Sequence, residues 1–225
     1  MGFFDIKTTM TTTQILNKIH EKYEGSTDYP TEGDDFDVRL ALVNQRIEDW
    51  QDENVNWREL YANSQDAATG DLTTVSSTLD YDCPDNFLHI SSFIKINTIE
   101  YEYMDQDKVL EDQTYPSGKR YFYITGGYGS YVINLSHDPE GAYPIYYMYY
   151  KEATLMTTGA NIPEMSRPKY IINGVLADLY EQDNRNDMVE LYTNKADEAM
   201  EQMIIQNEMN PQGQNFETEG FGFGE

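Results

Sequence analysis

The chain has 225 residues, and its 40 Asp and Glu against 15 Lys and Arg give a formal net charge of −25 at pH 7. This charge disfavours a nucleic-acid-binding role, because such proteins place Lys and Arg on phosphates. The acidic surface either keeps the protein in solution or lets a polyanion slide past without adhering. The single cysteine, Cys83, excludes an intrachain disulfide framework, and no apolar stretch reaches the roughly 20 residues that span a membrane.

The first predicted helix begins at residues 11–14, Thr-Thr-Thr-Gln, whose order is that of a capping box. Gly25 should end this helix. The acids that follow, Asp34, Asp35 and Asp37, lack the spacing and the closing Glu of a calcium loop. We interpret them as acids at the N-terminus of a second helix, where they complement the helix dipole.

The second helix is expected from about residue 37 to about residue 53, with apolar residues at every third or fourth position on its buried side. Arg39 is expected to face solvent. A short helical piece, residues 57–61, should follow. We interpret Trp50 and Trp57 as core residues or as contacts between subunits, in preference to a ligand platform.

From residue 72 the composition changes to short runs of Thr, Val, Ile, Tyr and Phe, which are typical of strands. The candidate strands are residues 73–77, 81–83, 87–94, 98–103, 121–125, 131–135 and 145–151. Short strands separated by Gly and Pro turns predict an antiparallel sandwich or small barrel. Residues 126–129, Gly-Gly-Tyr-Gly, lack the Lys that completes a phosphate loop, so a hairpin turn is expected there.

Tyrosines are concentrated in the last of these runs, where residues 146–150, Tyr-Tyr-Met-Tyr-Tyr, place rings on both faces of one strand. Rings on two faces indicate an interface as well as a core, since tyrosine joins an apolar body to a polar hydroxyl. We therefore assign Tyr147 and Tyr149, together with Trp50 and Trp57, to packing between subunits. The alternative is a glycan-binding module, of a tail fibre or of a surface protein, that uses these tyrosines.

Residues 167–207 predict two consecutive amphipathic helices, which residues 183–186, Asp-Asn-Arg-Asn, divide. Each helix has apolar residues at intervals of three and four, so each must bury one side against other helices. From Asp178 to Glu208 the segment holds nine acids and two bases, Arg185 and Lys195.

Residues 210–225 form a tail of Gly and polar residues that cannot stay folded alone. Phe216, Phe221 and Phe223 are apolar positions along this tail, as in a segment that becomes ordered on a partner. We expect a flexible C-terminal arm that docks through these three rings.

The order of helices, β block and helices predicts an α+β fold, in which a β domain is inserted into a bundle of N- and C-terminal helices. The expected parts are residues 1–70 for the N-terminal helices, 71–160 for the β domain, 161–209 for the C-terminal helices and 210–225 for the arm. His20, His89 and His137 are far apart in the sequence and have no paired Cys or His neighbours. No catalytic, cofactor-binding or metal site is predicted.

Six short runs, spread over nearly the whole chain, carry a resemblance to a known family. They are residues 13–16 (TQIL), 46–50 (RIEDW, followed by Trp57), 78–87 (TLDYDCPDNF), 121–127 (YFYITGG), 144–151 (PIYYMYYK) and 162–165 (IPEM). In these runs the chain resembles the head-to-tail adaptor proteins of tailed bacteriophages, also named connector, neck or head-completion proteins. The third run is similar to an extended G-x-x-x-Y-x-L-P-x-D-F pattern of such proteins, from which Ser77 and Cys83 depart.

The resemblance implies a structural virion protein and not an enzyme. It implies a ring, commonly of twelve copies, that is assembled in the host cytoplasm and docks under the portal protein at the neck, between capsid vertex and tail, with a tail or nozzle protein below. The C-terminal arm would reach the portal, and DNA would pass through the channel without specific binding during packaging and ejection. The channel-facing acids would then be Asp187, Glu190, Asp197, Glu198 and Glu201.

Overall fold

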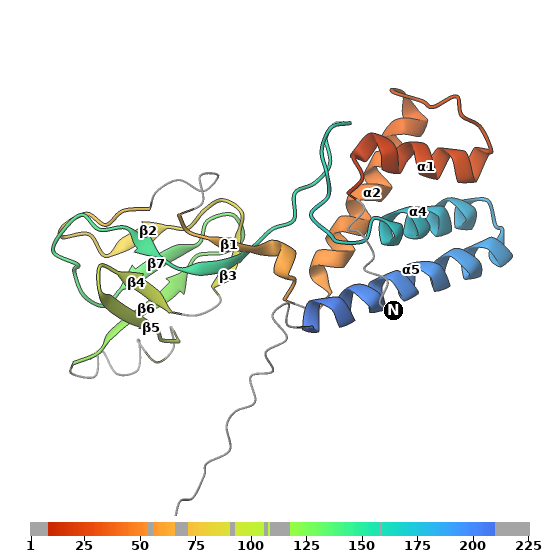
Figure 1. The fold of residues 1–225 in the computed structure, drawn as a ribbon. Helices are drawn as coiled ribbons and strands as arrows, with labels where there is room; N and C mark the ends of the chain where they lie inside the picture. Colours follow the sequence, from red (N-terminus) through yellow and green to blue (C-terminus); the bar gives the residue numbers. More distant parts are fainter. Residues whose placement is uncertain are drawn as a thin grey trace, which may run out of the picture. The chain divides into compact units, whose positions relative to one another are not determined.

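The computed structural model describes residues 9–53, 56–65, 72–90, 93–105, 108, 118–157 and 159–209. The chain divides into two compact units, a helical one from residues 1–55 and 153–225 and a β one from residues 56–152 (Figure 1). The predicted α+β fold is confirmed, because a β domain is inserted between the N-terminal and the C-terminal helices. The β unit begins before residue 70, where the sequence places the boundary, since residues 61–63 already pair in a sheet.

Four helices form the helical unit in the part of the chain that the structure describes. They are α1 (Thr12–Glu24), α2 (Asp34–Asp52), α4 (Lys169–Gln182) and α5 (Asn186–Glu208). The predicted capping box begins α1: the Thr11 hydroxyl accepts from the Gln14 backbone N–H at 3.3 Å, and the Gln14 side chain accepts from the Thr11 N–H at 2.9 Å. Gly25 ends the helix in the left-handed conformation, with a φ of 71°.

Helix α4 is the centre of this unit, since α1, α2 and α5 all pack against it (Figure 1). The sequence predicts a single apolar stripe on α4, yet ten of its 14 residues are buried. Val175 and Leu176 have no exposed surface at all. A helix that is apolar on nearly every side is one that other helices surround, so helices from both ends of the chain meet on α4.

Arg39 of α2 is buried, and the prediction that it faces solvent is wrong. Its guanidinium donates to Glu24 Oε1 at 2.9 Å and to His20 Nδ1 at 2.6 Å. Because a guanidinium can only donate, the Nδ1 atom of His20 accepts and carries no proton. Burial of this charge is tolerated because α1 supplies both acceptors, and the pattern of residues on α2 alone does not reveal them.

The β unit contains a short 3₁₀ helix and nine strands among the described residues. They are η1 (Arg58–Leu60), β1 (Tyr61–Asn63), β2 (Asp80–Asp82), β3 (Phe87–Ile90), β4 (Ile94–Ile96), β5 (Ile99–Tyr103), β6 (Arg120–Thr125), β7 (Val132–Leu135), β8 (Ile145–Tyr146) and β9 (Met148–Lys151). One sheet has the strand order β1-β9-β3, and the other has the order β2-β7-β6-β5-β4-β8. The strand pairs are antiparallel, as predicted, except for β5 and β6, which are parallel. Residues from both sheets share one apolar core.

Two runs that the sequence predicts as single strands are each divided between the two sheets. Residues 87–94 form β3 in the smaller sheet and then enter β4 in the larger one, and residues 145–151 pass from β8 to the central strand β9. Tyr147, which lies between β8 and β9, is 3% exposed and belongs to the shared core. The alternation of side chains along an apolar run does not reveal such a change of sheet.

The turn predicted at residues 126–129 joins the antiparallel strands β6 and β7. Gly126 has a φ of 91°, and a Cβ at this position would lie 2.1 Å from the carbonyl oxygen of Ser130. Both constraints require glycine at position 126, so Gly126 is explained by the hairpin.

We predict that Leu176→Ala lowers the free energy of unfolding of the helical unit by about 2–5 kcal/mol, the usual cost of a cavity in a close-packed core. Leu191→Ala is the matched control on α5. Leu191 is also a leucine of the helical unit, but it is 43% exposed, and its loss should change the free energy by less than about 0.5 kcal/mol. Urea unfolding followed by helical circular dichroism measures both values. Equal losses would contradict the central position of α4.

Candidate interaction surfaces

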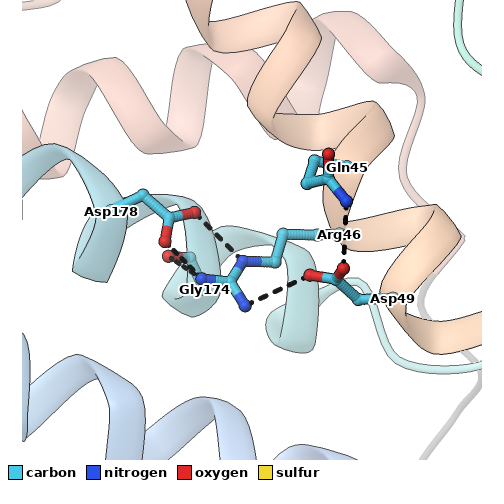
Figure 2. Close-up of polar contacts among 5 residues, drawn as sticks. All are labelled: Gln45, Arg46, Asp49, Gly174 and Asp178. Carbon is cyan, nitrogen blue, oxygen red and sulfur yellow. Dashed lines mark hydrogen bonds and ion pairs between the residues drawn. The ribbon is translucent and has the colours of Figure 1, made fainter.

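An arginine of α2 fixes that helix on α4 (Figure 2). Arg46 Nε donates to Asp178 Oδ2 at 3.0 Å, and Arg46 Nη2 donates to Asp178 Oδ1, a paired geometry that is stronger than a single contact. Nη1 also reaches Asp49 Oδ2 at 3.4 Å, and Nη2 reaches the Gly174 carbonyl at 3.4 Å. Burial alone would lower the pKa of Arg46, but the hydrogen bond and the charge of Asp178 outweigh it, and the pKa is raised.

Gly174 leaves room for this arginine on the surface of α4. A Cβ at Gly174 would lie 2.9 Å from Arg46 Cδ, so a larger residue would displace the arginine from Asp178. The carboxylate of Asp178 is therefore engaged inside the fold. It does not belong to the acids that α5 exposes.

Two lysines and two tyrosines form a contact where α1, α4 and α5 meet. The rings of Tyr180 on α4 and Tyr192 on α5 stack with their centroids 5.5 Å apart. The Nζ atoms of Lys195 and Lys22 lie 4.8 Å and 5.9 Å from the Tyr192 centroid, within the range of cation–π attraction. Burial lowers the pKa of Lys22, and the charge of Lys195 lowers it further. We call Lys22, Lys195 and Tyr192 the lysine seam.

Helix α1 also holds the turn between α4 and α5. The Tyr23 hydroxyl donates to Asp183 Oδ2 at 2.7 Å, and the Tyr23 ring lies 5.2 Å from that of Tyr180. Burial and this hydrogen bond raise the pKa of Tyr23 to about 12. Asp183 is thus a second carboxylate of the C-terminal segment that is engaged within the fold.

The five acids that the sequence singles out lie on one side of α5, and all are exposed. They are Asp187, Glu190, Asp197, Glu198 and Glu201. The buried side of the helix is formed by Tyr192, Ala196, Ala199, Met200 and Met203. At about 100° per residue, the two sets lie on opposite sides of the helix. In the described part of the chain, no Lys or Arg forms an ion pair with any of the five acids, which we call the acidic face.

The four aromatic residues that the sequence assigns to packing between subunits are buried within their own chain. Trp50 and Trp57 are 1% and 2% exposed, and Tyr147 and Tyr149 are 3% and 0% exposed. Tyr149 stacks on Phe87 with the ring centroids 5.6 Å apart, inside the core of the β unit. The four side chains expose almost no surface on a single copy of the chain, and their assignment to packing between subunits stays a prediction.

The burial of Tyr147 and Tyr149 disfavours the glycan-binding alternative, because sugars bind to exposed rings. Tyr147 and Tyr149 lie in the core, and Tyr146 is the member of that run with the clearest exposure, at 46%. The β unit does have a groove of about 580 Å³, which Phe93 and Tyr103 help to line. No tyrosine of residues 143–150 contributes to this groove.

The structure adds three findings on the arm, on metal binding and on membrane spans. Phe216, Phe221 and Phe223, the expected docking residues of the arm, lie outside the described residues. Within the described ranges, no three His, Cys, Asp or Glu side chains are grouped so as to hold a metal ion. None of the helices that the structure describes is both long and apolar enough to cross a membrane.

Comparison with known families assigns this bundle with its inserted β unit to a class of structural adaptors. The family model of the SU10 adaptor protein matches residues 10–215, and the chain belongs to this family of phage head-to-tail adaptors. The family resemblance found in the sequence is confirmed. The chain is accordingly a structural component of a phage particle that contacts other head or tail proteins. A search of curated proteins gives no match.

We predict that Tyr23→Phe lowers the free energy of unfolding by about 0.5–1.5 kcal/mol at neutral pH, because it removes the hydrogen bond to Asp183. The fold raises the pKa of Tyr23 from 10.0 to about 12, so it favours the neutral hydroxyl. That contribution is complete below the unfolded pKa of about 10 and is lost as the pH rises through about 12. The wild type should therefore lose stability more steeply than the variant across this pH window.

Thermal melting at a series of pH values from about 8 to about 12 measures this difference. Tyr146→Phe, at an exposed tyrosine of the β unit, is the control and should follow the wild type. If the curves of Tyr23→Phe and the wild type run parallel, Tyr23 does not carry the effect.

Proposed function

We propose that copies of this chain form a ring, a dodecamer like that of the adaptors it resembles, that docks on the portal protein and extends the DNA channel toward the tail. The ring occupies the neck, and a tail or nozzle protein follows it. Membership of a head-to-tail adaptor family supports this position, since a protein that joins head to tail lies on the path of the genome. The observation that carries the proposal is the acidic face of α5, which is exposed and opposite the buried side of the helix.

The acidic face lines the channel in this proposal. A channel wall rich in Lys and Arg would displace counterions from the DNA and hold it. Carboxylates repel phosphates instead, so the genome can pass in both directions without adhering. The net charge of −25 means that the chain as a whole also repels DNA phosphates.

The C-terminal arm, residues 210–225, docks on the portal in this proposal. It directly follows α5 and its C-terminal neighbour Met209 in the sequence, and it combines Phe216, Phe221 and Phe223 with Gly and polar residues. Such a composition suits a segment that folds on its partner and anchors through a few apolar side chains.

Mixing the purified chain with portal rings and examining the product by electron microscopy tests the docking. The full chain should add a symmetric tier to the portal, and a chain that ends before Asn210 should not. The triple variant Phe216→Ser, Phe221→Ser and Phe223→Ser should fail in the same way, while Gln212→Ser with Gln214→Ser should dock normally. A full chain that adds no tier would overturn the proposal, and a docked triple variant would exclude the three rings as anchors.

A charge reversal tests the channel. Glu198→Lys with Glu201→Lys should reduce phage infectivity by about tenfold or more, because the new lysines hold DNA phosphates and slow packaging or ejection. Glu48→Lys with Asp52→Lys makes the same change of charge on the exposed side of α2 and is the matched control. Normal infectivity of the α5 variant, or equal losses for both variants, would contradict a channel position for the acidic face.

A further inference from the structure

Helix α5 carries opposite charges on two opposite flanks. Lys195 and Asp197 are two residues apart, which at about 100° per residue points them to nearly opposite sides of the helix. Glu190 lies on the same flank as Asp197, because seven residues make close to two full turns. All three side chains are exposed.

The basic flank has no acidic partner in the described part of the chain. Lys22 and Lys195 both approach the Tyr192 ring, yet neither forms an ion pair there. Glu21, whose charge acts on Lys22, pairs with Lys18 at 3.5 Å. In a chain with 40 acids and 15 bases, two neighbouring ammonium groups that form no ion pair among the described residues make a surface that is complementary to an acidic partner.

We propose that the lysine seam of one copy receives Glu190 and Asp197 of the neighbouring copy, and that this contact closes the ring. The inference rests on the proposed ring and names the surfaces that join its subunits. The contact is head-to-tail, since one surface meets a different surface, which is the arrangement that a closed ring of identical copies requires. Because both surfaces include α5, the α5 helices of successive copies stand side by side.

This contact divides the acidic face between two tasks. Asp187, Glu198 and Glu201 lie between the two flanks of α5, by the same helical spacing, and they remain free to line the channel. Glu190 and Asp197 are shared with the neighbouring seam. Like flanks repel each other, lysine against lysine and acid against acid, so the charges disfavour a twofold dimer and select the head-to-tail contact.

Paired charge reversals test the contact in the full chain, with portal rings as the template. The seam variant is Lys22→Glu with Lys195→Glu, and the flank variant is Glu190→Lys with Asp197→Lys. Each variant alone places like charges across every contact, so the concentration needed for half-maximal assembly of the tier should rise by about tenfold or more. An equal mixture of the two variants should restore the tier, because alternating copies place opposite charges across every contact.

Two matched controls separate this contact from a general effect of charge. Lys95→Glu reverses an exposed lysine of β4, and Glu48→Lys with Asp52→Lys reverses two exposed acids of α2; both should assemble like the wild type. Glu190 and Asp197 are exposed and form no ion pair among the described residues, so the flank variant should keep the melting temperature of the wild type. The seam variant also loses the two cation–π contacts with Tyr192, so its circular dichroism spectrum must first show that it is folded, and recovery of the tier in the mixture then separates the contact between copies from this loss. Raising the salt concentration should weaken assembly of the wild type, because exposed charges are screened.

The outcomes distinguish this inference from the proposed function. If the wild type adds no tier to the portal, the proposed ring itself fails. If the wild type assembles and the two variants assemble equally well, the ring stands and the lysine seam is not its contact. If both variants fail and their mixture fails too, the charges act on another partner, and the contact between copies is overturned.

Discussion

The burial of α4 on nearly every side is the constraint on which the helical unit depends. Its neighbours come from both ends of the chain, α1 and α2 before the β unit and α5 after it. Contacts of such long sequence separation form only after a large loop has closed. The helical unit is therefore complete only when the whole chain is present, and the β unit is an insertion that this closure must span.

The few cations of the chain determine which acids reach the surface uncompensated. Arg39 pairs with Glu24, and Arg46 pairs with Asp178, so both arginines join helices inside the bundle. Breaking a partly buried pair would leave one charge without its partner, which costs more than the pair contributes. With these cations engaged between helices, the exposed side of α5 keeps its full negative charge.

Periodicity predicts the four helices and their order, because the spacing of apolar residues along a helix is a local property. It fails at Arg39, which is buried, since the acceptors that make burial possible come from α1. The acidic face could be predicted because exposed side chains of a helix need no partners from other elements, so their position follows from the spacing along the helix alone. The lysine seam could not: the spacing of α5 places Lys195 beside Tyr192, but only the packing of α1 brings Lys22 to the same ring.

The placement of the large aromatic residues limits how copies of this chain can join. Trp50, Trp57, Tyr147 and Tyr149 are buried in the chain's own cores, so these four residues offer no exposed ring of the kind that anchors tight complexes. Exposed charge pairs contribute little each, roughly 0–1 kcal/mol, and they set orientation more than affinity. A contact made only of such charge pairs is too weak to join free copies at low concentration. In the proposed ring, arms that tether neighbouring copies to one portal would raise their effective concentration, so the proposed contact would form on the portal and not between free copies.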